Sequence, residues 1–267
     1  MSKIYFVNHP EKEPPYTNGM ECQIIEWNCT KKHWRKLIKH DGVYLSDTNS
    51  SIRYAPLYFW GEYEPYSCAH INRGQLPAIH DDLKSARGCF PTPLSGMNNT
   101  DPYVFGPRFK YICCKKSKRA NLNKFDIVVF GHYMSGANLF YFDTVFVCKD
   151  DGKPVPTPDF ENQYYMAGVR PCGSTKSVYA EGLMYIDGEP IFSFVPCHYG
   201  DASKENLEFE KAFPYYELPA IDLSAWLPSA INPRTRHVVE FEPWMWKEIV
   251  EAVKKRGMCF GVHLAEI

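Results

Sequence analysis

The chain of 267 residues lacks a long apolar run. No stretch approaches the roughly 18 consecutive apolar residues that a membrane-spanning helix requires. The first ten residues also lack the apolar segment of a secretion signal, and residues 4–7 have the composition of a first strand. The sequence therefore predicts a cytoplasmic protein with no membrane partner.

The standard signatures of catalysis and cofactor binding are missing as well. There is no Gly-x-Ser-x-Gly elbow, no Gly-x-Gly-x-x-Gly, no glycine-rich phosphate loop and no His-Glu-x-x-His. The 10 cysteines include no Cys-x-x-Cys pair, so the usual spacing of zinc ligands is absent. Scattered cysteines of this kind are mostly reduced and buried. We expect neither a metal nor a cofactor, and the sequence leaves open whether the protein is an enzyme.

Aromatic residues, by contrast, are frequent: 18 Tyr, 17 Phe and 6 Trp make up 15% of the chain. Aromatic side chains favour strands, and they also form surfaces on which planar ligands stack. Their abundance is therefore consistent with a β-rich fold and with a planar ligand.

The pattern of apolar residues predicts two hairpins. Apolar runs at residues 125–130 and 139–147 flank a connector from Gly131 to Asn138, as in a buried antiparallel hairpin. A second hairpin is expected over residues 182–195, with Asp187-Gly188 as its turn.

Two helices are expected beside these strands, near residues 30–40 and 243–256. The first would place Trp34, Leu37 and Ile38 on one face and then end at an Asp41-Gly42 turn. In the second, Pro243 suits the first position and Gly257 the C-terminal cap, and a last strand follows. We predict a single α+β domain over residues 1–267, with a mainly antiparallel, barrel-like sheet and an internal boundary near the Pro-rich residues 150–159.

Positive charge is concentrated in two segments. Residues 102–125 contain seven Lys or Arg and no acid, and residues 30–40 contain five Lys or Arg. Because the net charge is −1, the remainder carries −1 − 12 = −13. This distribution favours an anionic partner, although two ordinary solvated faces would look the same. The candidate phosphate-binding residues are Arg35, Lys36, Arg108, Lys115, Lys116, Lys118 and Arg119.

A set of aromatic and polar residues could recognise a base. Aromatic faces stack on bases, and Asn, Asp or Glu side chains read their hydrogen-bonding edges. The alternative is that these residues are core aromatics and solvated acids. The candidate ligand-binding residues are Trp60, Tyr63, Asn99, Tyr103 and Tyr133, and the candidate catalytic residues are Glu62, Asp101 and His132.

The segment Asp126-Ile127-Val128-Val129-Phe130-Gly131, followed by Phe142-Asp143-Thr144-Val145-Phe146-Val147, resembles the barrel hairpin of the PUA, ASCH and EVE group. It is also similar to the nucleotide-modification-associated domains of phages and bacteria. The resemblance covers about residues 98–148. It implies a small β-barrel with a pocket for a base, usually that of a modified nucleotide.

These observations predict a protein that binds a nucleotide or nucleic acid, serving base modification or phage defence. One alternative is a nucleotide-processing enzyme, with Glu62 or Asp101 as general base and His132 as acid–base partner. Another is a protein-interaction subunit with an aromatic interface. The first hypothesis expects the two basic segments to border one groove in which Trp60 or Tyr133 is exposed.

Overall fold

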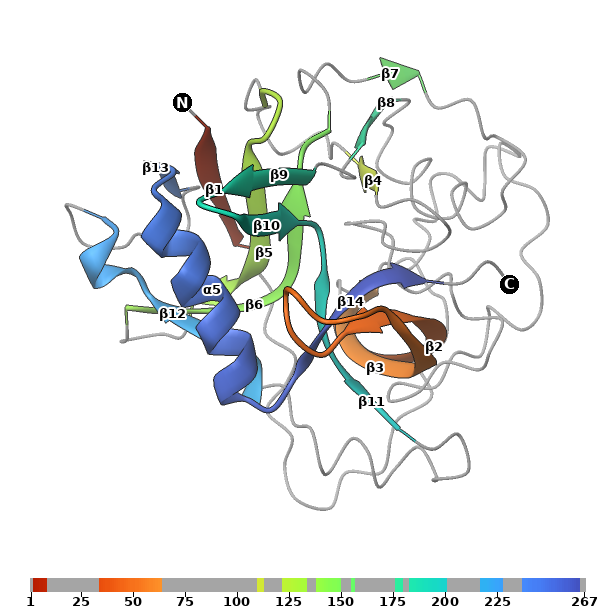
Figure 1. Ribbon diagram of the computed structural model, residues 1–267. Coiled ribbons are helices and arrows are strands. Elements are labelled where there is room, and N and C mark those ends of the chain that lie inside the picture. The colour runs from red at the N-terminus through yellow and green to blue at the C-terminus, as the bar shows by residue number, and fades with distance from the viewer. Residues whose placement is uncertain are drawn as a thin grey trace, which may run out of the picture.

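The computed structural model describes residues 2–8, 34–63, 110–112, 122–133, 138–149, 155–156, 176–179, 183–200, 217–227 and 237–264. Within these ranges the chain is mostly strand, with one α-helix. Figure 1 shows a five-stranded sheet, helix α5 across one side of it, and a closed four-stranded barrel next to it. The predicted α+β class is confirmed in part: the structure has a barrel-like, mainly antiparallel sheet, and one α-helix is described where two were expected.

The five-stranded sheet has the order β12-β6-β5-β1-β13. Strands β1 and β5 pair in parallel, and the other three pairs are antiparallel. Its strands are β1 (Lys3–Asn8), β5 (Ile127–Tyr133), β6 (Leu139–Val147), β12 (Ala220–Asp222) and β13 (His237–Glu240). A short 3-10 helix, Leu223–Ala225, follows β12.

The hairpin predicted around residues 131–138 is confirmed, because β5 and β6 pair antiparallel from Ile127↔Val147 to Tyr133↔Phe140. The register shifts between Phe130 and Gly131, so β6 carries one extra residue, Asp143, at a β-bulge. This hairpin, which resembles a barrel hairpin in sequence, lies in the five-stranded sheet. The closed barrel is built from other strands.

The barrel has the order β11-β14-β2-β3 and closes where β11 pairs with β3. Its longest ladder joins β2 to β3 and runs from Trp34↔Tyr63 to Tyr44↔Arg53. The strands are β2 (Trp34–Leu45), β3 (Arg53–Tyr63), β11 (Val195–Tyr199) and β14 (Cys259–Leu264).

The helix predicted near residues 30–40 is wrong from Trp34 onward, because this segment is the first part of β2. The predicted turn at Asp41-Gly42 is also wrong, since both residues pair with β3 inside the ladder. Three apolar residues at helical spacing are a weak signal, and a helix this short is marginal on its own. The long ladder with β3 and the pairing with β14 outweigh that local preference.

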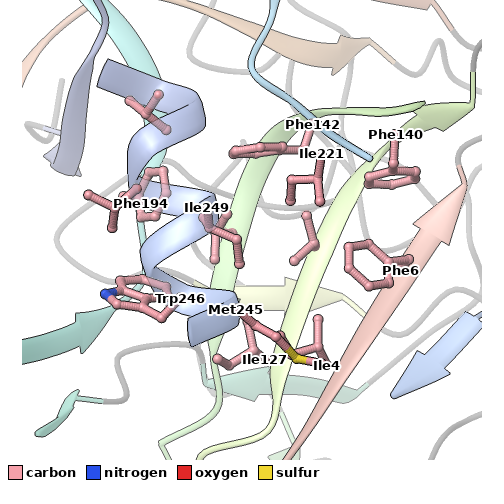
Figure 2. Close-up of a cluster of buried hydrophobic side chains, with 14 of the residues drawn as sticks. Ile4, Phe6, Ile127, Phe140, Phe142, Phe194, Ile221, Met245, Trp246 and Ile249 are labelled. Carbon is pink, nitrogen blue, oxygen red and sulfur yellow. The ribbon is translucent and has the colours of Figure 1, made fainter. Parts of the chain in front are cut away.

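The C-terminal helix and strand are confirmed. Helix α5 (Pro243–Lys255) begins at the predicted proline, and Gly257 after its end has the left-handed φ of +65° that suits a glycine. Figure 2 shows Met245 and Ile249 directed from α5 toward side chains of the sheet, and the Trp246 ring packs against Phe194. Each such buried side chain contributes about 1.5–3 kcal/mol relative to exposure, so α5 is held mainly by this stripe.

Side chains of β1 alternate between two buried clusters. Ile4 and Phe6 belong to the cluster that includes α5, which we call the helix-side cluster. Tyr5 belongs to the second, which we call the barrel-side cluster. Both faces of the sheet are therefore covered, which explains why its central strands are nearly continuous apolar runs.

The second predicted hairpin is also confirmed. Strands β9 (Leu183–Ile186) and β10 (Glu189–Phe192) pair antiparallel around Asp187 and Gly188. Asp187 has a φ angle of +53° and Gly188 one of +82°, as expected for the two-residue turn that an Asp-Gly pair favours. A further small sheet has the order β4-β8-β7 and comprises β4 (Lys110–Ile112), β8 (Lys176–Tyr179) and β7 (Val155–Pro156).

Candidate ligand-binding surface

Many of the predicted site residues lie outside the described ranges. Their assignments stay predictions, and the same holds for the relation between the two basic segments. These residues are Asn99, Asp101, Tyr103, Arg108, Lys115, Lys116, Lys118 and Arg119.

The structure brings two of the predicted segments together. The β2–β3 ladder pairs Arg35 with Glu62 and Lys36 with Gly61, and Trp34 pairs with Tyr63. The start of the first basic segment therefore runs beside the segment from Trp60 to Tyr63. Their backbones are placed by this register, and the ligand roles proposed for them stay predictions.

Trp60 is not the exposed stacking residue that the nucleic-acid hypothesis expected. Only 3% of its surface is accessible, and it lies in the helix-side cluster. The reason is that β3 is buried on both faces here: Tyr58 and Trp60 face the helix-side cluster, and Leu57 and Phe59 face the barrel-side cluster. The alternative interpretation of Trp60, as an anchor in the core, matches the structure.

His132 and Tyr133 lie at the carboxyl end of β5, which extends into the predicted connector, and both are half-buried. The His132 ring stacks on Tyr141 with a centroid distance of 5.2 Å and an interplanar angle of 23°. Tyr133 meets Phe140 edge to face at 4.8 Å and His237 at 5.6 Å. Burial raises the pKa of Tyr133, and its buried hydroxyl has no hydrogen-bond partner among the described residues. Both rings thus contribute to packing at this sheet end.

Another cluster of aromatic and basic side chains, on the barrel, was not anticipated from the sequence. Tyr44 of β2 and Tyr199 of β11 stack with a centroid distance of 4.7 Å and an interplanar angle of 17°. Arg53 lies directly opposite Tyr44 in the ladder, close enough for its guanidinium to act against the burial that raises the pKa of the Tyr44 hydroxyl. We call Tyr44, Arg53 and Tyr199 the barrel aromatic site.

The barrel aromatic site is open to solvent on one side. Tyr44 is 4% exposed and belongs to the barrel-side cluster, whereas Tyr199 is 50% exposed. Arg53 is exposed and has no carboxylate partner in the part of the chain that the structure describes. Burial is the main cause that raises the pKa of Tyr44, so its hydroxyl stays neutral at physiological pH. The site therefore presents the accessible Tyr199 ring, which is stacked on the buried Tyr44 ring, beside the positive charge of Arg53.

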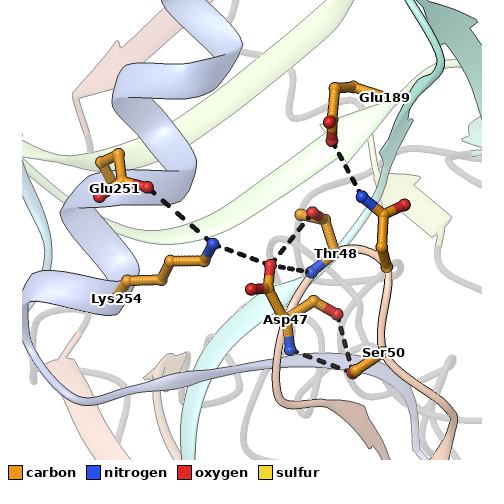
Figure 3. A network of polar contacts seen from close by, with 7 residues as sticks. Asp47, Thr48, Ser50, Glu189, Glu251 and Lys254 are labelled. Atoms are coloured by element: carbon orange, nitrogen blue, oxygen red, sulfur yellow. Dashed lines mark hydrogen bonds and ion pairs between the residues drawn. The ribbon is translucent and has the colours of Figure 1, made fainter.

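The loop at residues 46–52 fixes the relation between Tyr44 and Arg53, because it joins the strands that carry them. Asp47 accepts hydrogen bonds from the backbone and hydroxyl of Thr48 at 2.7 and 3.2 Å, and its backbone N–H donates to Ser50 Oγ at 3.0 Å (Figure 3). Lys254 of α5 forms an ion pair with Asp47 at 2.8 Å. The loop is thereby attached to the last turn of α5.

We predict a small, pH-dependent loss of stability on replacing Lys254 with methionine. The Lys254 hydrogen bond is the main cause that lowers the pKa of Asp47 from 3.8. This contribution is present above pH 3.8 and is lost as the pH falls through the lowered value. Both side chains are partly exposed, so the loss should stay below about 1 kcal/mol. Urea unfolding at neutral and acidic pH measures it, and Lys255→Met is the matched control. An equal loss at both pH values would contradict the ion-pair explanation.

Comparison with known proteins gives no relative from which a role could be transferred: no family model, curated protein or solved structure matches the chain. Among the described residues, no helix has the length and apolar character needed to cross a bilayer. The functional argument therefore rests on the side chains themselves.

Sequence reasoning missed the barrel aromatic site because its residues are distant in the chain. Tyr44 and Tyr199 become neighbours only when β11 closes the barrel against β3. A weak signal was present in Arg53, a basic residue at the start of a strand with no adjacent acid. That signal is common on protein surfaces and does not identify a site without the partner strand.

Proposed function

We propose that this protein binds a nucleotide or a nucleic-acid strand, and that a base stacks on Tyr199 while Arg53 contacts a phosphate. The observation that carries the proposal is the half-exposed Tyr199 ring, stacked on Tyr44 and flanked by Arg53. Ring stacking is worth about 1–3 kcal/mol per base. Arginine matches the geometry and charge of phosphate.

Two further features support this choice of ligand. The basic residues Arg35 and Lys36 lie toward the other end of the β2–β3 ladder from Tyr44 and Arg53, where a nucleic-acid strand rather than a single nucleotide would reach them. The resemblance of residues 98–148 to the PUA, ASCH and EVE group favours a modified base as the preferred ligand. A role in base modification or phage defence would follow from that preference.

The test is a fluorescence anisotropy titration of labelled single strands, with and without a modified base, at several salt concentrations. Tyr199→Ala should weaken binding about 5- to 150-fold, which is the loss of one stacked base. Arg53→Ala should weaken binding to every sequence and lower the slope against log salt by about 0.7–0.9. Stability of each variant is checked by urea unfolding.

Tyr54→Ala is the matched control, because Tyr54 is 64% exposed and adjacent to Arg53 but points to the other face of β3. Binding that is unchanged in Tyr199→Ala would exclude the barrel aromatic site. Salt-insensitive capture of a protein, weakened by Tyr185→Ala at the exposed face of β9, would instead favour the interaction-subunit alternative.

A further inference from the structure

The barrel places two cysteines directly opposite each other. Cys197 of β11 pairs with Cys259 of β14 in the antiparallel register, next to Pro196↔Phe260. Both cysteines are free thiols, and both belong to the barrel-side cluster. This pair was not predictable from the sequence, because the two cysteines lie on strands that meet only in the closed barrel.

This register is compatible with a covalent link. Directly opposite residues of an antiparallel pair project to the same face, with Cβ atoms about 4.5–5.5 Å apart. A disulfide requires about 3.5–4.5 Å between Cβ atoms and about 4.4–6.8 Å between Cα atoms. Closing the bond therefore needs only a small approach of β11 and β14. A bond formed under such a constraint is strained and easily reduced.

The surroundings give the two thiols different roles. Cys259 is 8% exposed and is close enough to Arg53 for the positive charge to favour its thiolate, whereas Cys197 is fully buried. Burial raises the pKa of both thiols, so oxidation should accelerate as the pH rises.

We infer that Cys197 and Cys259 form a reversible disulfide when the protein meets a peroxide. The Cys259 thiolate attacks hydrogen peroxide and the O–O bond breaks, which gives a sulfenic acid and hydroxide. The hydroxide takes up the proton that the Cys259 thiol released and becomes one water. The Cys197 sulfur then attacks the Cys259 sulfur. The S–O bond breaks, and the departing hydroxide takes the Cys197 proton to give the second water. Two thiols and one peroxide thus become one disulfide and two waters. The inference does not depend on the proposed function.

Peptide mapping of the full chain tests this inference. The protein is incubated with and without hydrogen peroxide under native conditions, alkylated in denaturant and digested. The expected result is a linked peptide containing Cys197 and Cys259, lighter by two hydrogens, which disappears after dithiothreitol. Cys148 is the internal control: it lies in the same cluster, burial raises its pKa to about 12, and no described cysteine is registered opposite it. Its alkylation should not change.

Two variants complete the experiment. C259S should abolish the linked peptide, and C148S should leave it unchanged. Oxidation of Cys259 to sulfinic acid without the linked peptide would overturn the inference, as would full alkylation of both cysteines at peroxide concentrations that oxidise a free thiol. Because the wild-type map is decisive, the test holds even if one variant fails to fold.

Discussion

Replacing Gly131 with alanine is expected to cost at least about 3 kcal/mol of folding free energy. Gly131 lies at the β-bulge, where the Tyr141 carbonyl approaches its Cα closely. A Cβ atom added there would collide with that carbonyl and would lie 2.8 Å from both the Phe140 ring and the Phe142 Cα. Two of these three neighbours are backbone atoms, so no side-chain rotation relieves the clash.

Urea unfolding of the wild type and Gly131→Ala measures the loss. Gly257→Ala is the matched control, because Gly257 has a φ of +65° but no atom within 4 Å of an added Cβ. The control should lose only about 1–2 kcal/mol, which is the cost of a left-handed backbone for alanine. Equal losses at the two positions would mean that the bulge does not constrain Gly131.

Elements determined by short-range patterns were predictable. The turn at Asp187-Gly188, the proline that starts α5 and the glycine that follows it each act through backbone preferences of one or two residues. The β5–β6 hairpin was also predictable, because two apolar runs separated by a short connector have few ways to bury themselves. In all of these, the interacting residues are close in the sequence.

The first part of β2 shows where such reasoning fails. The spacing of Trp34, Leu37 and Ile38 fits a helix, but each residue is paired with β3 in the structure. A ladder of eleven registered pairs is a long-range interaction that a window of ten residues does not contain. The expected exposure of Trp60 was wrong for the same reason: Trp60 is aromatic and follows an apolar run, and only the tertiary fold shows that both faces of that run are buried.

Contacts that close the barrel were beyond prediction from the sequence. Cys197 meets Cys259, and Tyr44 meets Tyr199, through strands far apart in the chain. Loop-closure entropy opposes contacts between distant strands, and no local sequence pattern indicates which distant strand a given strand will pair with. The proposed ligand site and the proposed disulfide both depend on this closure.

Phe194 is the residue whose replacement should destabilise the closed barrel most. It directly precedes β11 and exchanges two backbone hydrogen bonds of 2.9 Å with Val145 of β6, which join the barrel to the five-stranded sheet. Its ring is fully buried and meets Trp246 of α5 at 5.9 Å and Phe260 of β14 at 5.0 Å. The Phe194 ring thus contacts the helix and the barrel, and its backbone pairs with the sheet.

Phe194→Ala should therefore lower the free energy of unfolding by about 3–5 kcal/mol. The cavity left by the ring would be lined by other aromatic rings from separate elements, which cannot move in to fill it. Urea unfolding measures this loss, with Tyr185→Ala as the control, since Tyr185 is 67% exposed and should change stability by less than about 0.5 kcal/mol. Hydrogen exchange should show β11 losing protection before β5, because β11 depends on this junction. If protection fell equally in β5 and β11, or if the loss stayed below about 1 kcal/mol, Phe194 would not be the link between sheet and barrel.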